Sequence, residues 1–168
     1  MTDVLQALID ARHHVDTKWV RSAWFKYVEK DSDTPETGDN VPKNAQVIGV
    51  CAAGSVLYAL DYTNEQWTSK KDVRPVMEAL YGALPQRSHA RMRTERVIKD
   101  RQDFFEEHRA NPLFTKKNLT DQIYSAKVDG VVEYNDLPSH GKQDVLNLFD
   151  KAIENVRVAT FTICELEP

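Results

Sequence analysis

Most segments of this chain that contain apolar residues repeat them at the spacing of an α-helix. This periodicity limits the possible folds more than any other feature of the sequence. Spacings of three and four residues place side chains on one face of a helix, where they can be buried together. The pattern predicts helices over 4–15, 47–60, 72–84, 88–109, 119–126 and 144–156. We therefore expect a compact, mainly α fold with at most a small two- or three-stranded sheet, and an α+β arrangement stays open.

The length of 168 residues is typical of a single domain, over 1–168. We expect the first helix, the helix around Cys51 and the helix over 144–156 to form one core. The region 72–109 is rich in charge and predicts a charged helical hairpin, inserted beside the core or projecting from it.

Other segments are less regular. The segment 19–28 has helical spacing but is rich in aromatic and β-branched residues, so helix and strand both stay open. The segment 31–46 contains two prolines, a glycine and four acids, which predicts a mobile polar loop. Asp129 and Gly130 indicate a turn, 131–134 a brief strand or buried extended segment, and 159–168 an edge strand or a docked tail.

Composition excludes several classes of protein. A net charge of −4 gives no general attraction to nucleic acid or to an anionic membrane surface. The apolar runs are too short for a membrane helix, and the start lacks the basic region of a secretory signal. Cys51 and Cys164 are far apart and suit a reducing compartment. We expect a cytoplasmic protein without a cofactor or a metal, and without a glycine-rich phosphate loop.

Two short motifs stand on either side of the charged middle region. Cys51-Ala-Ala-Gly-Ser follows the polar loop, and Tyr134-Asn-Asp precedes the last helix. With an opening helix and a segment around Trp19, they resemble a small family of unknown function from actinobacteria and their phages. That family carries a Cys-Ala-x-Gly element and an aromatic-Asn-Asp element before a C-terminal helix. The matching positions are Cys51, Ala52, Gly54, Tyr134, Asn135, Asp136, Val145, Leu148, Ala152 and Ile153.

The resemblance implies little chemistry, because the family has no established activity. It implies that the segment near Trp24 is extended, and that 67–118 is longer than usual and carries an added helical hairpin. Ser55 stands where alanine is more usual in the family.

Cys51 is the candidate nucleophile. A thiol at a helix start can have a lowered pKa, but it also needs a base and a group that orients the base. The candidates are His13, His14, His89, His108 and His140 as base, with Asn135 or Asp136 as the orienting group. The spacings differ from those of papain-like enzymes, and a small buried thiol beside alanines is the favoured interpretation. Asn135 and Asp136 are likewise typical of turns and helix caps.

Two other groups of residues indicate binding. The segment 87–101 carries six basic and two acidic residues, among them Arg91, Arg93 and Arg96, which could meet phosphates or an acidic protein surface. Trp19, Trp24 and Trp67 are candidate anchors for a protein partner, although core packing is the more common role of a tryptophan. His13 and Asp16 share a helix face, but no third metal ligand is identified.

These observations favour a non-enzymatic protein-binding or regulatory protein. Such a protein could be encoded by a phage and act on a host protein. A Cys51-dependent hydrolase or transferase, and a weak nucleic-acid-binding protein that uses the Arg87–Arg101 helix, are the alternatives. We expect a protein partner and no membrane, and homo-oligomers stay open.

Overall fold

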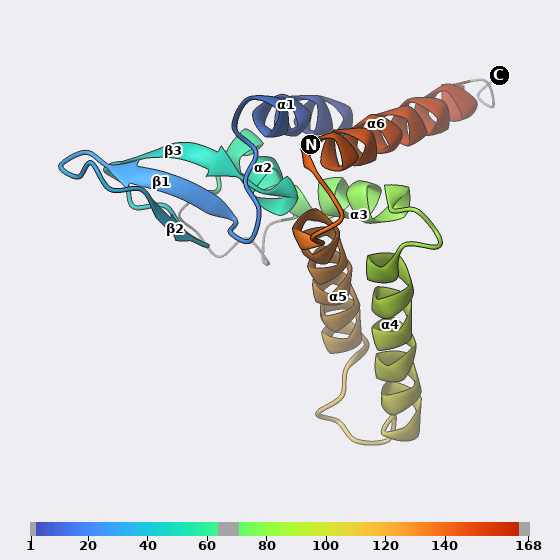
Figure 1. Cartoon of the computed structure of the whole chain (residues 1–168). Coiled ribbons are helices and arrows are strands. Elements are labelled where there is room, and N and C mark those ends of the chain that lie inside the picture. Colours follow the sequence, from blue (N-terminus) through green and yellow to red (C-terminus); the bar gives the residue numbers. More distant parts are fainter. Residues whose placement is uncertain (1–2, 64–70, 165–168) are drawn as a thin grey trace.

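The computed structural model describes residues 3–63 and 71–164. Its described part confirms a mainly α fold with a small sheet (Figure 1). The helices are α1 (Val4–Lys18), α2 (Ala52–Ala59), α3 (Val73–Ala83), α4 (His89–Glu107), α5 (Lys116–Asp136) and α6 (Lys142–Cys164). The strands β1 (Phe25–Glu29), β2 (Glu36–Gly38) and β3 (Ala45–Val50) form one antiparallel sheet in the order β2-β1-β3.

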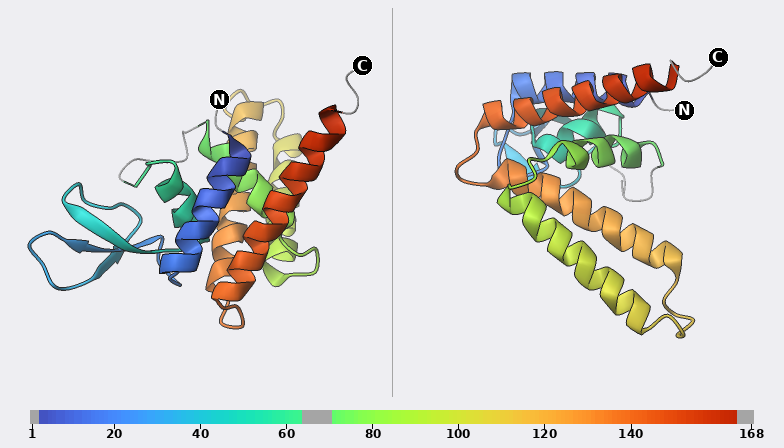
Figure 2. Two further views of the ribbon diagram at one scale, coloured as in Figure 1. Left: turned by 90° about the horizontal axis from the view of Figure 1, so that it is seen from above. Right: turned by 90° about the vertical axis from the view of Figure 1, so that its right-hand side faces the viewer.

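The expected core of the first helix, the Cys51 helix and the last helix is confirmed, and α3 completes it. α1 packs against both α2 and α6, and α3 packs against α5 and α6. Figure 2 shows α1 and α6 side by side above α2 and α3. Leu8, Leu57, Leu80 and Phe149 are fully buried in this one cluster. The helices bury apolar faces against one another, and α2 is buried on all sides over 52–57. The largest favourable term in folding therefore comes from contacts between helices.

The projecting hairpin pairs different helices from those expected over 72–109. α4 packs against α5 along its length, whereas α3 lies in the core and buries Val73, Val76, Met77 and Leu80. Pro85 and Ser88 lie between α3 and α4. Ser88 is the N-cap of α4, because its hydroxyl accepts a hydrogen bond from the Arg91 amide. That this region is an insertion in its family stays a prediction.

The predicted turn at 129–130 and the strand at 131–134 are wrong, because α5 is one continuous helix to Asp136. Gly130 does not serve a turn. A Cβ atom there would collide with the hydroxyl of Thr94 on α4, so glycine permits the close approach of the two helices. Contact between helices therefore offsets the roughly 1 kcal/mol that glycine costs inside a helix.

The open choice over 19–28 is resolved in favour of an extended segment and a strand, because 25–29 forms β1. The polar segment 31–46 is not simply a loop, since it contains β2 and the start of β3. The helix predicted from residue 47 starts only at Ala52, and 47–50 belong to β3. The edge strand predicted at 159–168 is replaced, as far as residue 164, by the end of α6.

Among the helices of the described part of the chain, none combines enough length with enough apolar character to cross a bilayer.

Candidate functional site

Cys51 lies at the junction of β3 and α2 and is the N-cap residue of α2. Its Sγ accepts a hydrogen bond from the Gly54 amide at 3.3 Å, and its own amide donates to the Trp24 carbonyl at 3.1 Å. The residue is 1% exposed. Burial raises the pKa of the Cys51 thiol to about 12, although hydrogen bonds from backbone amides oppose this rise. The arrangement holds a neutral thiol that caps a helix and fills the core.

We expect Cys51 to resist alkylation in the folded protein. A Cys164→Ser variant leaves one thiol, and its reaction with iodoacetamide at pH 8 should be at least about a thousandfold slower than that of the unfolded chain. The thiolate is the reactive form, and both the raised pKa and burial reduce its availability. Quenched-flow or mass-spectrometric labelling with and without urea measures the two rates.

A rate of native labelling close to that in urea would contradict this interpretation and restore Cys51 as a candidate nucleophile. Labelling that follows the fraction of unfolded protein at each urea concentration would support it.

The histidines do not complete a catalytic site with Cys51. Within the described residues, no hydrogen bond or ring contact joins a histidine to Cys51. Their contacts are Tyr58 for His14, Glu133 for His89, Phe104 for His108 and the Tyr134 carbonyl for His140, while His13 is exposed on α1. The described part of the chain also contains no group of three or more metal-ligating side chains.

Asn135 is fully buried at the end of α5 and joins three separate segments. Its Oδ1 accepts hydrogen bonds from Trp19 Nε1 at 2.9 Å and from the Ala52 amide at 3.2 Å. Its Nδ2 donates to the Val20 carbonyl at 3.3 Å. The Ala52 amide belongs to the first turn of α2, where backbone donors have no partner within the helix. Asn135 therefore supplies a partner that this buried helix start needs.

Asp136 supports the same junction. Its Oδ1 accepts hydrogen bonds from Asn135 Nδ2 and from the Ser22 amide, both at 2.8 Å. Ser22 has a φ of 62°, which few residues other than glycine adopt, so this hydrogen bond holds a tight bend after α1. A carboxylate with these partners is committed to structure, although both residues lie in the last turn of α5 and not in the turn or helix cap that the sequence predicted.

The tryptophans in the described residues lie near this junction. Trp19 is half-buried, donates to Asn135 and has the guanidinium of Arg21 5.5 Å from its ring centre. Trp24 is half-buried and packs against the core. Both placements favour packing over anchoring of a partner. Trp67, the third predicted anchor, lies outside the described residues.

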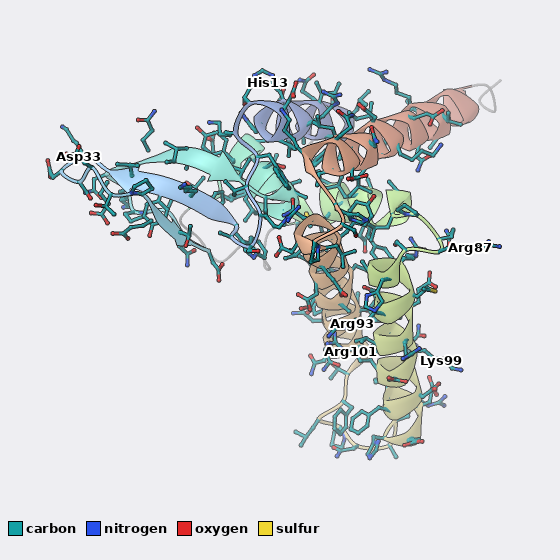
Figure 3. All side chains as sticks on the ribbon, in the orientation of Figure 1. His13, Asp33, Arg87, Arg93, Lys99 and Arg101 are labelled. Carbon is teal, nitrogen blue, oxygen red and sulfur yellow. The ribbon has the colours of Figure 1, made fainter. Side chains whose placement is uncertain are left out.

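The arginines predicted to form a binding stripe have different surroundings. Arg91 is held by Glu95 at 2.6 Å and by the Tyr81 carbonyl at 2.9 Å. Figure 3 shows Arg93 turned toward α5, where it pairs with Glu133 at 3.3 Å. Arg96 is exposed on α4 and makes no hydrogen bond or ion pair with any described residue. The three arginines therefore do not form one continuous basic surface.

Sequence reasoning missed the aromatic cluster at the free end of the α4–α5 hairpin, here called the hairpin tip: Phe104, His108, Leu113 and Phe114. The Phe104 ring lies 4.2 Å from that of His108 and 5.3 Å from that of Phe114, measured between ring centres. Leu113 is 77% exposed and Phe104 is 48% exposed. The sequence signal for this cluster was the pair Leu113-Phe114, which lies in the connection between α4 and α5. Apolar side chains in such a connection have no helix face to bury them.

The comparisons with known proteins identify a family and no activity. No curated protein matches this chain, and no solved structure matches it. The model of one family covers residues 1–155 and stops within α6, so the match includes the Cys51 junction and the hairpin. This match confirms the expectation from the two motifs that the chain belongs to a family of unknown function. The occurrence of that family in actinobacteria and phages stays a prediction. The chain belongs to a family of unknown function, DUF6197.

Proposed function

We propose that this protein is a non-enzymatic binding protein that docks a partner protein through its hairpin tip. The observation that carries the proposal is the cluster of exposed Phe104, His108 and Leu113 with half-buried Phe114, at the end of a projecting helical hairpin (Figure 2). Aromatic side chains dominate the binding energy of protein interfaces, usually at a few central positions.

The cluster is already ordered by its own contacts. Stacking of Phe104 on His108, and the edge contact of Phe114 on Phe104, hold the rings together at the surface. The Thr115 hydroxyl accepts from the Asn118 amide and starts α5 directly after the cluster. Preorganised side chains lose little conformational entropy on binding, so the cluster suits recognition.

The alternatives have weaker support. A Cys51-dependent enzyme needs a thiolate and a neighbouring base, whereas the thiol is buried and its pKa is raised. A nucleic-acid-binding protein needs arginines free to meet phosphates. Arg91 and Arg93 are each paired with a glutamate, so the three arginines Arg91, Arg93 and Arg96 do not present a row of free cations.

Location and origin belong to the same proposal. A cytoplasmic protein of phage origin would have a host protein as its partner. Docking through one end of the molecule leaves the remaining surface available for contacts between copies of this chain.

Photocrosslinking from the hairpin tip tests the proposal. We expect p-benzoylphenylalanine at Leu113, expressed in the native host and irradiated, to give one dominant adduct of defined mass. The matched control is the same amino acid at Val158, which is 59% exposed on α6, away from the tip. Phe104→Ala and Phe114→Ala should each reduce the Leu113 adduct about tenfold, as expected for truncated anchor residues.

The same adduct from both positions would show non-specific contact and contradict the proposal. So would the lack of any adduct from Leu113, or an adduct that persists in the double variant Phe104→Ala/Phe114→Ala.

A further inference from the structure

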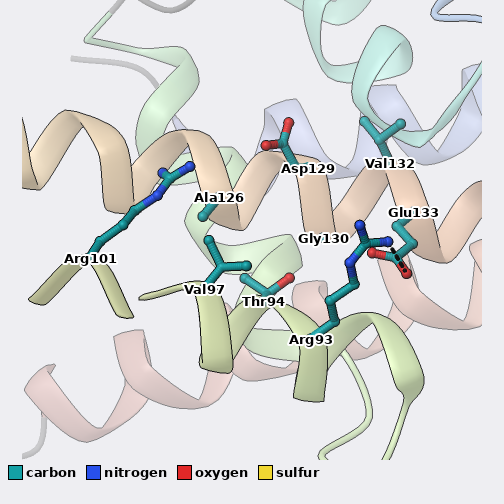
Figure 4. Close-up of a pocket in the computed structure, with 9 residues that line it drawn as sticks. All are labelled: Arg93, Thr94, Val97, Arg101, Ala126, Asp129, Gly130, Val132 and Glu133. Atoms are coloured by element: carbon teal, nitrogen blue, oxygen red, sulfur yellow. Dashed lines mark hydrogen bonds and ion pairs between the residues drawn. The ribbon is translucent and has the colours of Figure 1, made fainter. Parts of the chain in front are cut away.

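A cleft of about 450 Å³ lies between α4 and α5 on the side of the hairpin, apart from the tip (Figure 4). Its lining includes the small residues Thr94, Ala126 and Gly130, where the two helices come close together. Because these side chains are short, the helices approach closely and still leave a groove above the contact. The groove is large enough for a small molecule.

Charged side chains of both signs line this cleft. α4 contributes Arg93 and Arg101, which are eight residues apart and so about 12 Å apart along the helix axis. α5 contributes Asp129 and Glu133, one turn apart. Figure 4 shows the guanidinium of Arg101 reaching across α5 toward the side on which the Asp129 carboxylate lies. Groups of both signs therefore line the cleft.

Two of these four charged side chains are already paired with each other. Arg93 and Glu133 form an ion pair at 3.3 Å. Arg101 donates to the Gln122 carbonyl, and Asp129 makes no hydrogen bond or ion pair with any described residue. Desolvation by the neighbouring helices raises the pKa of Asp129, although the residue is exposed, and the charge of Arg101 opposes this rise. Arg101 keeps further N–H donors, since a guanidinium has five.

We propose that this cleft binds a small amphoteric molecule, with an ammonium group on the Asp129 carboxylate and a carboxylate on the Arg101 guanidinium. The body of such a molecule, of amino-acid or dipeptide size, would lie over Ala126 and Gly130. The ammonium would pair with an exposed carboxylate that makes no hydrogen bond or ion pair within the described part of the chain. The paired Arg93 and Glu133 cancel each other at the other end, so a molecule with two like charges finds one matching and one opposing group.

Titration of the isotope-labelled protein with glycylglycine tests this inference by NMR. We expect saturable shifts of the amide signals of Thr94, Ala126 and Gly130. Succinate, with two negative charges, and 1,4-diaminobutane, with two positive charges, should bind at least about tenfold more weakly. Tighter binding of either compound would overturn the amphoteric assignment, and the absence of saturable shifts with glycylglycine would remove the site.

Matched variants separate the cleft from general charge effects. Arg101→Gln and Asp129→Asn should each weaken glycylglycine binding about tenfold or more, as expected for the loss of a charged hydrogen bond. Arg96→Gln and Asp100→Asn change the same charges at exposed positions of α4 outside the cleft lining, and should leave binding unchanged. Equal losses in both pairs of variants would overturn the proposal. Because the cleft and the hairpin tip use different residues, this test does not depend on the outcome of the crosslinking experiment.

Discussion

Replacement of Asn135 by alanine is expected to lower the free energy of unfolding by about 3–5 kcal/mol. The change removes the acceptor of the Trp19 and Ala52 donors and the donor to the Val20 carbonyl. Ala52 is fully buried, so its amide would be left without a partner and away from water. Each buried polar group orphaned in this way costs about 1–3 kcal/mol. Urea denaturation followed by circular dichroism measures the loss.

Two further variants make this prediction specific. Asn147 is exposed on α6 and makes a hydrogen bond only with Gln143 among the described residues, so Asn147→Ala should change the free energy of unfolding by less than about 0.5 kcal/mol. Asn135→Asp keeps the acceptor but loses the amide donor, and places a second carboxylate beside Asp136. It should destabilise the protein at pH 7. If Asn135→Ala cost no more than Asn147→Ala, the junction would not be a structural centre of the fold.

Replacement of Gly54 by alanine is the second large effect, with an expected loss of about 2–4 kcal/mol. Gly54 lies in α2, and an added Cβ would overlap the backbone carbonyl of Trp24. That carbonyl is held in place because it accepts a hydrogen bond from the Cys51 amide. A rigid backbone cannot move aside as a flexible side chain can, so the helix has to shift and lose contacts in the core.

Gly82 is the matched control for this experiment. It lies in α3, and nothing lies within 4 Å of the position where a Cβ would be added. Gly82→Ala should therefore stabilise the protein, by up to about 1 kcal/mol, because alanine favours the helix. Opposite signs for the two substitutions, from urea midpoints measured side by side, would confirm that close packing explains Gly54. A stabilising Gly54→Ala would contradict the contact with Trp24.

The two motifs on which the resemblance depended meet in the fold. Ala52 donates its amide to Asn135, while Cys51 and Gly54 both contact the backbone of Trp24. These residues therefore build a junction between α2, α5 and the segment that follows α1. Their arrangement explains the motifs by packing and hydrogen bonding, and the candidate binding surfaces lie elsewhere, on α4 and α5.

The sequence by itself determined the mainly α class, most of the helices and the packing of α1, α2 and α6 into one core, but not the place of α3 in that core. Helical periodicity and N-caps such as Asp3 and Ser88 act over a few residues and can be recognised without knowledge of the fold. The same local signals misplaced α5, because Gly130 indicates a turn unless Thr94 is known to lie against it.

Only the tertiary structure decided the partners of each segment and the location of the candidate sites. The hairpin of α4 with α5, the junction around Asn135 and the cleft with Arg101 and Asp129 each join residues that lie far apart in the chain. Asn135 looked like a turn residue, and its burial depends on the packing of three separate segments. Local pattern carries no information about which faces meet, because that choice is made by the packing of all the helices together.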